Sequence, residues 1–365
     1  MPLDARTLLS GPRGRRLCLA VACLDPRSDI PQVAALGELL FYATYNLETA
    51  RGQGGTMFGW GAPRPLPEPS VEEIVDALNA IPLTDLSSAD LLEALAISVD
   101  SARYWQEPDG SDELLSDARL ATPLQRIAEH TVASPSATWL SSSIATEQWA
   151  VTFRDLFLQR PPPPVAALAL KQWHTAAVEE ERIAVRDRPS DATAALSGTW
   201  WSRPPDDPAV TTRAVPEAGP VGVWLVEDRL DSEPADAQRV HYAPTVRVFE
   251  ILGSESWAEL CRSYPLSVTA GRRHDWYQTT GRIGEWMMPN WSLVARDYDA
   301  VHLSVAAYLS SAGIAIPVDD DVASVIAGWN PDETYWLTDV VRGEFSETSW
   351  MRDERTLRWH PIARL

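Results

Sequence analysis

The stretch from residue 271 to residue 291, GRRHDWYQTTGRIGEWMMPNW, gathers side chains that can do chemistry. It holds three arginines, one histidine, one tyrosine, three tryptophans and two acids. Guanidinium groups bind tetrahedral oxyanions such as sulfate or phosphate through paired, charge-assisted hydrogen bonds. Indole and phenol groups add donors, and their ring faces can hold a substrate ammonium. The pattern predicts a site for a small anionic, amine-bearing substrate.

Each residue type in this Arg/Trp segment has a candidate role. Three arginines would bind the anionic group, one of two adjacent polar residues would be the acid or base, and four aromatic side chains would form walls. The candidates are Arg272, Arg273 and Arg282 for the anion, His274 and Asp275 for proton transfer, and Trp276, Tyr277, Trp286 and Trp291 for the walls.

The same segment also has interpretations without catalysis. Tryptophans are large core residues, and clusters of arginine, aspartate and tryptophan can join a loop to a sheet without touching a ligand. Tryptophan and arginine are also enriched at protein interfaces, where exposed rings would form a binding surface. A shallow aromatic platform with few arginines would instead indicate carbohydrate binding. An enclosed pocket around Arg272 and Arg273 would favour the enzyme over these binders.

Charge and composition exclude several classes of function. The 365 residues include 31 basic and 51 acidic ones, which gives a formal charge of −20. Nucleic-acid binding is not expected, because affinity for phosphates comes largely from basic residues that displace counterions. No apolar run is long enough for a membrane span. Three cysteines without a CxxC pair fit a reducing cytoplasm.

The chain contains a single lysine, Lys171, and this limits the choice of cofactor. A Walker phosphate loop needs Gly-Lys-Ser/Thr, and no glycine precedes Lys171. Pyridoxal phosphate would have to use this same residue, which lies in an apolar helical stretch. The glycine-rich stretch 52–61 follows an expected helix and is interpreted as a loop or lid. No cofactor is predicted.

Two groups of acidic residues raise the question of a metal. Asp297, Asp299 and His302 lie near one another on an expected helix, where Asp299 and His302 would share a face. Three aspartates at 319–321 would suit a cation or a solvated turn. Neither spacing matches a specific metal motif. The sequence therefore predicts no metal, and His302 is interpreted as a hydrogen-bonded core histidine.

Apolar periodicity predicts a mainly helical region over residues 1–190. Ser70 and Glu73 form a capping-box pattern before IVDALNAI. Spacings of three and four residues predict helices at 85–105, 112–130, 138–160 and 165–186, with a proline run at 161–164 between the last two. The apolar stretch within 12–26 is expected to be a buried strand rather than a signal peptide.

Residues 191–365 are predicted to form an α+β region. The stretches SGTWWSRPP, AVTTRAV, VGVWLVED and TVRVFEIL predict an antiparallel sheet, and helices are expected at 254–262 and over 293–313. The predicted fold class is α+β, with a mainly helical N-terminal half packed against a C-terminal half that has an antiparallel sheet and flanking helices. The second helix would bury one face made of Val294, Tyr298, Val301, Val305 and Tyr308.

Together with AGWNPDETYWLTD at 327–339, the Arg/Trp segment resembles a group of actinobacterial proteins. Among named groups it is most similar to the ring-closing enzymes of azinomycin-type antibiotic biosynthesis. The resemblance brings no motif that aligns position by position, so it assigns no catalytic residue. It implies secondary metabolism, closure of an aziridine or azabicyclic ring by an amine that displaces sulfate, and a sulfotransferase as a candidate partner protein.

The sequence thus favours a cytoplasmic small-molecule enzyme, a non-redox cyclase or lyase. Sulfate leaves readily once preorganised donors hold its developing charge, and the attacking amine must be neutral and aimed at the carbon. The alternative is a non-catalytic protein-interaction or ligand-binding protein that uses the Arg/Trp segment as its surface.

The purified protein should show no flavin, haem or pyridoxal absorption. Its melting temperature should also stay the same after treatment with a chelator. The single lysine does not suit pyridoxal phosphate, and the acidic groups match no metal motif. Absorption spectroscopy, metal analysis and thermal melting check this. A stoichiometric metal whose removal lowers the melting temperature would contradict it.

Overall fold

The computed structural model describes residues 3–24, 30–53, 65–154, 165–229, 234–353, 356 and 358–362. Most of the glycine-rich stretch 52–61 and the whole proline run 161–164 lie outside these residues. The loop predicted at the first and the helix boundary predicted at the second are therefore untested.

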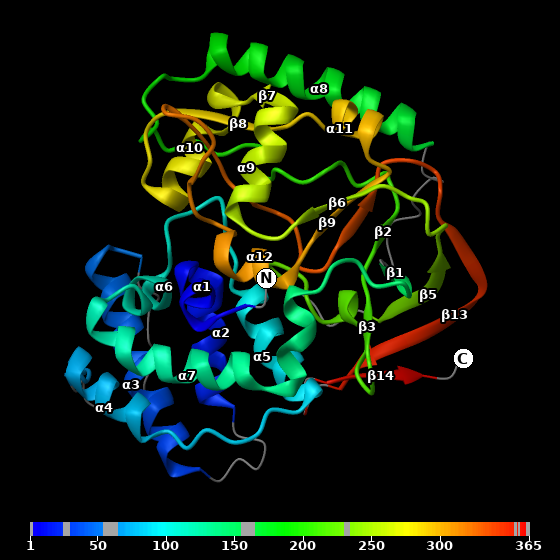
Figure 1. The fold of residues 1–365 in the computed structure, drawn as a ribbon. Helices are drawn as coiled ribbons and strands as arrows, with labels where there is room; N and C mark the ends of the chain where they lie inside the picture. The colour runs from blue at the N-terminus through cyan, green and yellow to red at the C-terminus, as the bar shows by residue number, and fades with distance from the viewer. Residues whose placement is uncertain are drawn as a thin grey trace.

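Helices dominate the N-terminal part of the chain (Figure 1). Ser70 accepts a hydrogen bond from the amide of Glu73, whose side chain reaches back to the Ser70 amide, so the predicted capping box is confirmed. A second box, of Ser87 and Asp90, starts the next helix. The described elements are α1 (Ala5–Ser10), α2 (Pro12–Cys23), α3 (Pro31–Ala50), α4 (Val71–Ala80), α5 (Ser88–Asp100), α6 (Gly110–Leu115), η1 (Ala118–Leu120), α7 (Ala121–Ala133) and η2 (Pro135–Ser141).

Helix α2 occupies the segment predicted as a buried strand, so that prediction is wrong. A short apolar run cannot distinguish a buried strand from a buried helix by periodicity alone. Here Leu17 and Val21 are buried as α2 packs against α5 and α12 (Val305–Ser311). The first turn also buries Arg13, which donates to the carbonyl of Ser98 at 3.1 Å.

The described part of the C-terminal half holds three four-stranded sheets and a hairpin of β3 (Ala214–Val215) and β4 (Gly219–Pro220). The first sheet is antiparallel throughout, in the order β1 (Gln148–Phe153), β5 (Ala235–His241), β13 (Arg342–Arg352), β14 (Trp359–Ile362). The second runs β10 (Ile316–Pro317), β11 (Val322–Ser324), β8 (Glu285–Pro289), β7 (Pro265–Ser267). The third runs β2 (Val210–Thr211), β12 (Thr334–Trp336), β9 (Ala300–Leu303), β6 (Val248–Ile251).

The α+β prediction is confirmed, with helices mostly in the N-terminal half and mainly antiparallel sheets in the C-terminal half. Two strand pairs are parallel, β6 with β9 and β8 with β11. The expected helix at 254–262 is present as α9. The helices of this half are η3 (Val221–Val223), α9 (Ser254–Ser263), α10 (Thr269–Thr280), α11 (Trp291–Asp297) and α12.

Helix α8 (Ala166–Asp187) confirms the helix predicted at 165–186 and lies along the outside of the C-terminal half (Figure 1). It packs against α10 and α11 through small side chains such as Ala169, Ala177 and Ala184. Lys171 is exposed on it. Strand β1 likewise precedes residue 190 but pairs with β5, so elements on both sides of that residue pack together.

Two predicted helices are wrong because the chain changes structure within them. Residues 138–160 contain the end of η2 and strand β1 rather than one helix. Residues 293–313 are divided into α11, β9 and α12. All four residues of β9 are buried, and a strand covered on both faces is a continuous apolar run that imitates helical spacing.

Two of the four predicted strands are also wrong. Residues 197–205 have no regular structure, and VGVWLVED forms η3 and a loop. In VGVWLVED the apolar side chains are buried by irregular chain, and the indole of Trp224 donates to the carbonyl of Ala218 at 3.0 Å. In the first stretch Trp201 is 37% exposed. The strand predictions in AVTTRAV and TVRVFEIL are confirmed by β2, β3 and β6.

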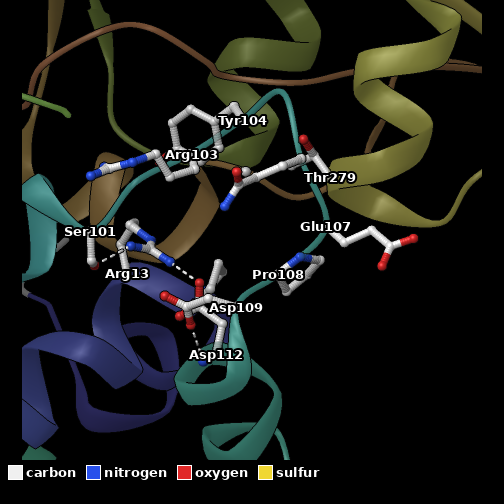
Figure 2. Close-up of a pocket in the computed structure, with 12 residues that line it drawn as sticks. Arg13, Ser101, Arg103, Tyr104, Glu107, Pro108, Asp109, Asp112 and Thr279 are labelled. Atoms are coloured by element: carbon white, nitrogen blue, oxygen red, sulfur yellow. Dashed lines mark hydrogen bonds and ion pairs between the residues drawn. The ribbon is translucent and has the colours of Figure 1, made fainter. Parts of the chain in front are cut away.

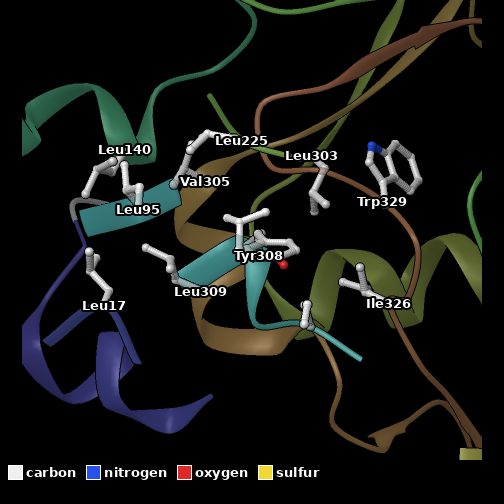
Figure 3. Packing of buried hydrophobic residues seen from close by; sticks show 14 of the residues in the cluster. Leu17, Leu95, Leu140, Leu225, Leu303, Val305, Tyr308, Leu309, Ile326 and Trp329 are labelled. Carbon is white, nitrogen blue, oxygen red and sulfur yellow. The ribbon is translucent and has the colours of Figure 1, made fainter. Parts of the chain in front are cut away.

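One continuous buried cluster joins the two halves (Figure 3). Leu17 of α2 and Leu95 of α5 lie near Leu309 of α12. On the other side of the view, Leu303 and Trp329 belong to the same cluster and come from the C-terminal half. Helix α12 is therefore the element of the C-terminal half against which the helical region packs.

A buried polar network fixes the edge of the third sheet. Asp332 accepts from the amide of Arg213 at 2.8 Å and from its Nε at 2.5 Å, and His302 lies between Asp332 at 3.3 Å and Glu250 at 2.6 Å. Burial opposes a charge on His302, but its bonds to both carboxylates raise its pKa overall. The interpretation of His302 as a hydrogen-bonded core residue agrees with this geometry.

Asp332→Asn should lower the free energy of unfolding by about 3–5 kcal/mol, because the change leaves the buried charge of Arg213 without its counter-charge. Urea unfolding measures the loss. The control is Asp187→Asn, which removes an exposed pair with Arg186 and should cost less than about 1 kcal/mol. Equal losses in the two variants would show that the buried network contributes little.

Candidate active site

The Arg/Trp segment forms α10, a short turn, β8 and the first residue of α11. Arg272 is 4% exposed and donates from Nη1 to Glu180 of α8 at 3.0 Å. Arg273 donates to the carbonyl of Ser190 at 3.1 Å. Arg282 lies over the ring of Trp286 and donates to two backbone carbonyls. All three arginines are thus bonded to protein groups, and their anion-binding role stays a prediction.

The two candidates for proton transfer are buried side by side on α10. Asp275 accepts from the hydroxyl of Ser197 at 2.6 Å and the amide of Gly198 at 3.1 Å, while burial raises its pKa. His274 is 1% exposed, and neither ring nitrogen has a hydrogen-bond partner among the described residues. Burial and the charge of Arg273 lower the pKa of His274, which favours the neutral ring. Their catalytic role also stays a prediction.

The three tryptophans of the segment are buried. Trp276 donates to the carbonyl of Trp200 at 2.7 Å, and its ring lies 5.3 Å from that of Trp286. Trp291 belongs to a different cluster, with Trp257 and Trp329. Tyr277 is half-buried. The structure therefore brings Trp276 and Trp286 together, separates Trp291 from them, and gives none of the three an exposed face.

A pocket lies where the helical region meets the C-terminal half, with about 380 Å³ of empty space that includes open solvent at its mouth (Figure 2). Arg13 of α2, Tyr104 and Asp112 line it, together with Thr279 of α10 and Gly313. Gly313 has φ +74°, and a Cβ there would lie 2.4 Å from the ring of Tyr104. Thr279 is in the last turn of α10, so this helix reaches the pocket with its C-terminal end, whereas Arg272 and Arg273 lie near its N-terminal end.

Arg13 supplies a fixed charge in the wall of the pocket. Its Nη1 donates to the hydroxyl of Ser101 at 2.6 Å, and its Nη2 pairs with Asp112. Its Nε has no hydrogen-bond partner in the described part of the chain. Glu107 and Asp109 also line the pocket, so basic and acidic groups occur around one cavity. Such a wall suits a small zwitterion better than a simple anion.

Two tyrosines connect the pocket with the interior. The hydroxyl of Tyr104 lies 3.3 Å from that of Tyr308 on α12. Burial, and next the charge of Glu227, raise the pKa of both phenols well above the ordinary value. Both therefore stay protonated at neutral pH, and they can pass a proton only by donating one while accepting another.

Behind the tyrosines lie two carboxyl groups, Glu227 and Glu333. Burial raises the pKa of each to about 7, although a hydrogen bond from Tyr308 opposes the rise at Glu227 and one from Asn330 opposes it at Glu333. Asn330 links the two by donating to Glu333 at 2.8 Å and accepting from the amide of Glu227 at 2.9 Å. One oxygen of each carboxyl is buried without a hydrogen-bond partner among the described residues.

Strand pairing explains why these groups meet. Strand β9 ends at Leu303, whose amide donates to the carbonyl of Glu333 just before β12 begins. Asp332 has φ +65°, so the chain turns sharply before Glu333. Tyr308 follows β9 on α12. The site therefore lies at the carboxyl end of the parallel pair β6–β9, a position where ligands often bind in sheets with parallel strands.

These functional candidates were not singled out by the sequence patterns. Glu333 and Asn330 lie within AGWNPDETYWLTD, and Glu227 is the second-last residue of VGVWLVED, which is predicted as a strand. No spacing rule connects two acids about a hundred positions apart. The available signal was a glutamate within each of two tryptophan-rich stretches.

The acidic groups considered for a metal are separated in the structure. His302 lies on β9, not on a helix with Asp299, so the shared helical face is wrong. Asp297 accepts from the hydroxyl of Tyr264, and Asp299 accepts from the amide of Arg247. The described residues contain no group of three histidine, cysteine or acidic side chains that could hold a metal. Among them, no helix is both long and apolar enough to cross a bilayer.

Comparisons of the chain with protein-family models, with curated proteins and with solved structures find no match. Function therefore has to be inferred from the site itself.

Proposed function

We propose that the protein is a small-molecule enzyme whose reaction depends on general acid–base catalysis by Glu227, with Glu333 as its partner. The observation that carries this proposal is that two buried carboxyls, on residues joined through Asn330, both have pKa values of about 7. A group whose pKa lies near the working pH can both accept and return a proton, and such shifts are concentrated at functional sites.

The two carboxyls would divide the work through their mutual repulsion. When one is ionised, its charge makes ionisation of the other less favourable, so the pair holds about one proton near neutral pH. The ionised member is a base and the protonated member an acid. Asn330 joins the Glu333 carboxyl to the backbone of Glu227, because it donates to the former and accepts from the amide of the latter.

Substrate would bind in the pocket beside Arg13 and Tyr104. Its proton would reach Glu227 through the hydroxyls of Tyr104 and Tyr308, each of which donates one proton as it accepts another. Neither phenol has to ionise in this transfer, which is consistent with their raised pKa values. The mixed charges of the pocket would orient a substrate that carries both an amine and an anionic group.

The specific reaction we propose is the ring closure implied by the resemblance. The amine lone pair attacks a neighbouring carbon, the carbon–oxygen bond to sulfate breaks, and the bonding electrons leave with the sulfate oxygen. The amine loses one proton to the carboxyl pair. This step needs no oxidant or reductant, and the carboxyl pair supplies the base that it requires.

The alternative, a non-catalytic binding protein, would use the same pocket without proton transfer. The version that depends on an exposed Trp surface has less support, since Trp276, Trp286 and Trp291 are at most 1% exposed.

Glu227→Gln and Glu333→Gln should each stabilise the protein at pH 8 but not at pH 4.5. The folded pKa of each group is about 7, against an ordinary value of 4.5. The folded chain therefore keeps protons that the unfolded chain loses, and stability falls as pH rises from 4.5 to 7. Removing one carboxyl should recover up to about 3 kcal/mol above pH 7.

Chemical unfolding across this pH range checks the effect, with Glu129→Gln on the exposed side of α7 as the control. Glutamine variants that are less stable than the wild type at every pH would rule out a neutral carboxyl pair.

An amine that bears a sulfate ester on the adjacent carbon should release inorganic sulfate in the presence of the wild-type protein. Glu227→Gln should slow the release by about a hundredfold or more, because it removes the base. Tyr308→Phe should also slow it by breaking the proton path. Sulfate assay and mass spectrometry of the cyclised amine are the measurements.

Glu129→Gln is again the matched control and should react like the wild type. Release at equal rates in Glu227→Gln and the wild type would remove the carboxyl from the mechanism. No release with a series of such esters would contradict ring closure and favour the binding protein.

A further inference from the structure

The first turn of α10 already holds a carboxylate. Glu181 of α8 accepts from the amide of Ala270 at 2.8 Å with Oε1 and from the amide of Gly271 at 2.7 Å with Oε2. Val268, the residue before the helix, provides no side-chain cap. Free amides and the helix dipole make the start of a twelve-residue helix a good site for an anion. In this structure the anion is part of the chain itself.

A second carboxylate extends this contact. Glu180 pairs with Arg272, one of the most deeply buried arginines described. Burial lowers the pKa of Arg272 although Glu180 and Asp275 favour its charge, so the pair compensates the burial only in part. Its Nε has no hydrogen-bond partner within the described residues.

Further donors near this turn lack acceptors. His274 lies one turn after Gly271 on the same face of α10, and both of its ring nitrogens are buried without hydrogen bonds to the described chain. Arg188 donates to the carbonyl of Gly271 at 2.7 Å, and the Nε of Arg273 is buried without a partner there. The Nε atoms of Arg272 and Arg273 are thus buried donors without an acceptor beside the start of α10, and donors of this kind can receive an oxyanion.

The helix that provides the two carboxylates is attached by small side chains. Its buried residues are four alanines and one leucine: Ala166, Ala169, Leu170, Ala177 and Ala184. Its outer side exposes Leu168, Val178, Ile183 and Val185. Alanines bury little apolar area, so the carboxylate contacts are a large part of what holds the C-terminal half of α8 in place.

We propose that the start of α10 is an oxyanion-binding site which Glu180 and Glu181 occupy as internal substitutes, and that a sulfate or phosphate group displaces them and loosens α8. The ligand would receive the amides of Ala270 and Gly271 and the guanidinium of Arg272. With the second half of α8 moved away, Arg272 and Arg273 would remain on α10 next to the two freed amides.

This site is separate from the pocket of the proposed function. Thr279 lines the pocket, and Gly271 lies eight positions earlier on the same helix, about 12 Å away at 1.5 Å per residue. The oxyanion site therefore does not depend on the carboxyl pair, and each can fail without the other.

The test compares sulfate and phosphate with chloride at equal ionic strength. In the wild type, hydrogen exchange followed by mass spectrometry should show faster exchange in the second half of α8 with sulfate than with chloride. The first turn of α10 should stay protected, since the ligand replaces Glu181. Unchanged exchange in α8 up to saturating sulfate would overturn the proposal.

The double variant Glu180→Gln/Glu181→Gln removes the internal competitor. Its melting temperature should rise with sulfate concentration, and its affinity should exceed that of the wild type by at least about tenfold, because an attached group competes at millimolar effective concentration or higher. Adding Arg272→Gln should abolish the response.

The neighbouring Glu179→Gln is the matched control, because Glu179 is exposed and pairs with the exposed Arg182. It should respond like the wild type. A double variant that melts at the same temperature in sulfate and chloride would show that Glu180 and Glu181 only join two helices. If the double variant does not fold, the hydrogen-exchange result in the wild type decides.

Discussion

The buried ion pair between Arg213 and Asp332 is the constraint on which the sheet edge depends. Removing two charges from water costs several kcal/mol, and only close contacts and complete hydrogen bonding compensate this cost. Asp332 meets the condition by binding both the backbone and the side chain of Arg213 and by facing His302. These contacts fix the backbone turn at Asp332. The position of this turn then determines the direction of Glu333 and Asn330.

The pKa values of the two neighbouring acids Asp332 and Glu333 are shifted in opposite directions. Burial alone would raise the pKa of Asp332, but the partners His302 and Arg213 lower it. The adjacent Glu333 is also desolvated but lacks such a partner for one oxygen, and its pKa rises. Environment rather than residue type therefore separates a structural carboxylate from one that can exchange protons, which is how folds assign acid and base roles.

The sequence predicted the fold class and several elements because their signals are local. The capping box at Ser70 and the amphipathic pattern of α8 need only their own residues. Strand β9 and helix α2 could not be assigned this way, because their apolar runs become strand or helix through distant packing. The Arg/Trp segment was located, but its partners Glu180 and Glu181 lie ninety positions earlier, and no spacing rule connects them. Glu227 and Glu333 are likewise far apart in the sequence and are joined through Asn330.

The single lysine gives the molecule an unusual experimental property. Lys171 is exposed on α8, the helix that rests on alanines. Reagents that react with side-chain amines will therefore modify one helix only. A lysine-specific protease has one possible cleavage position in the whole chain, within this helix, and a folded helix resists cleavage until it opens locally. The rate of this single cleavage therefore measures how readily α8 opens.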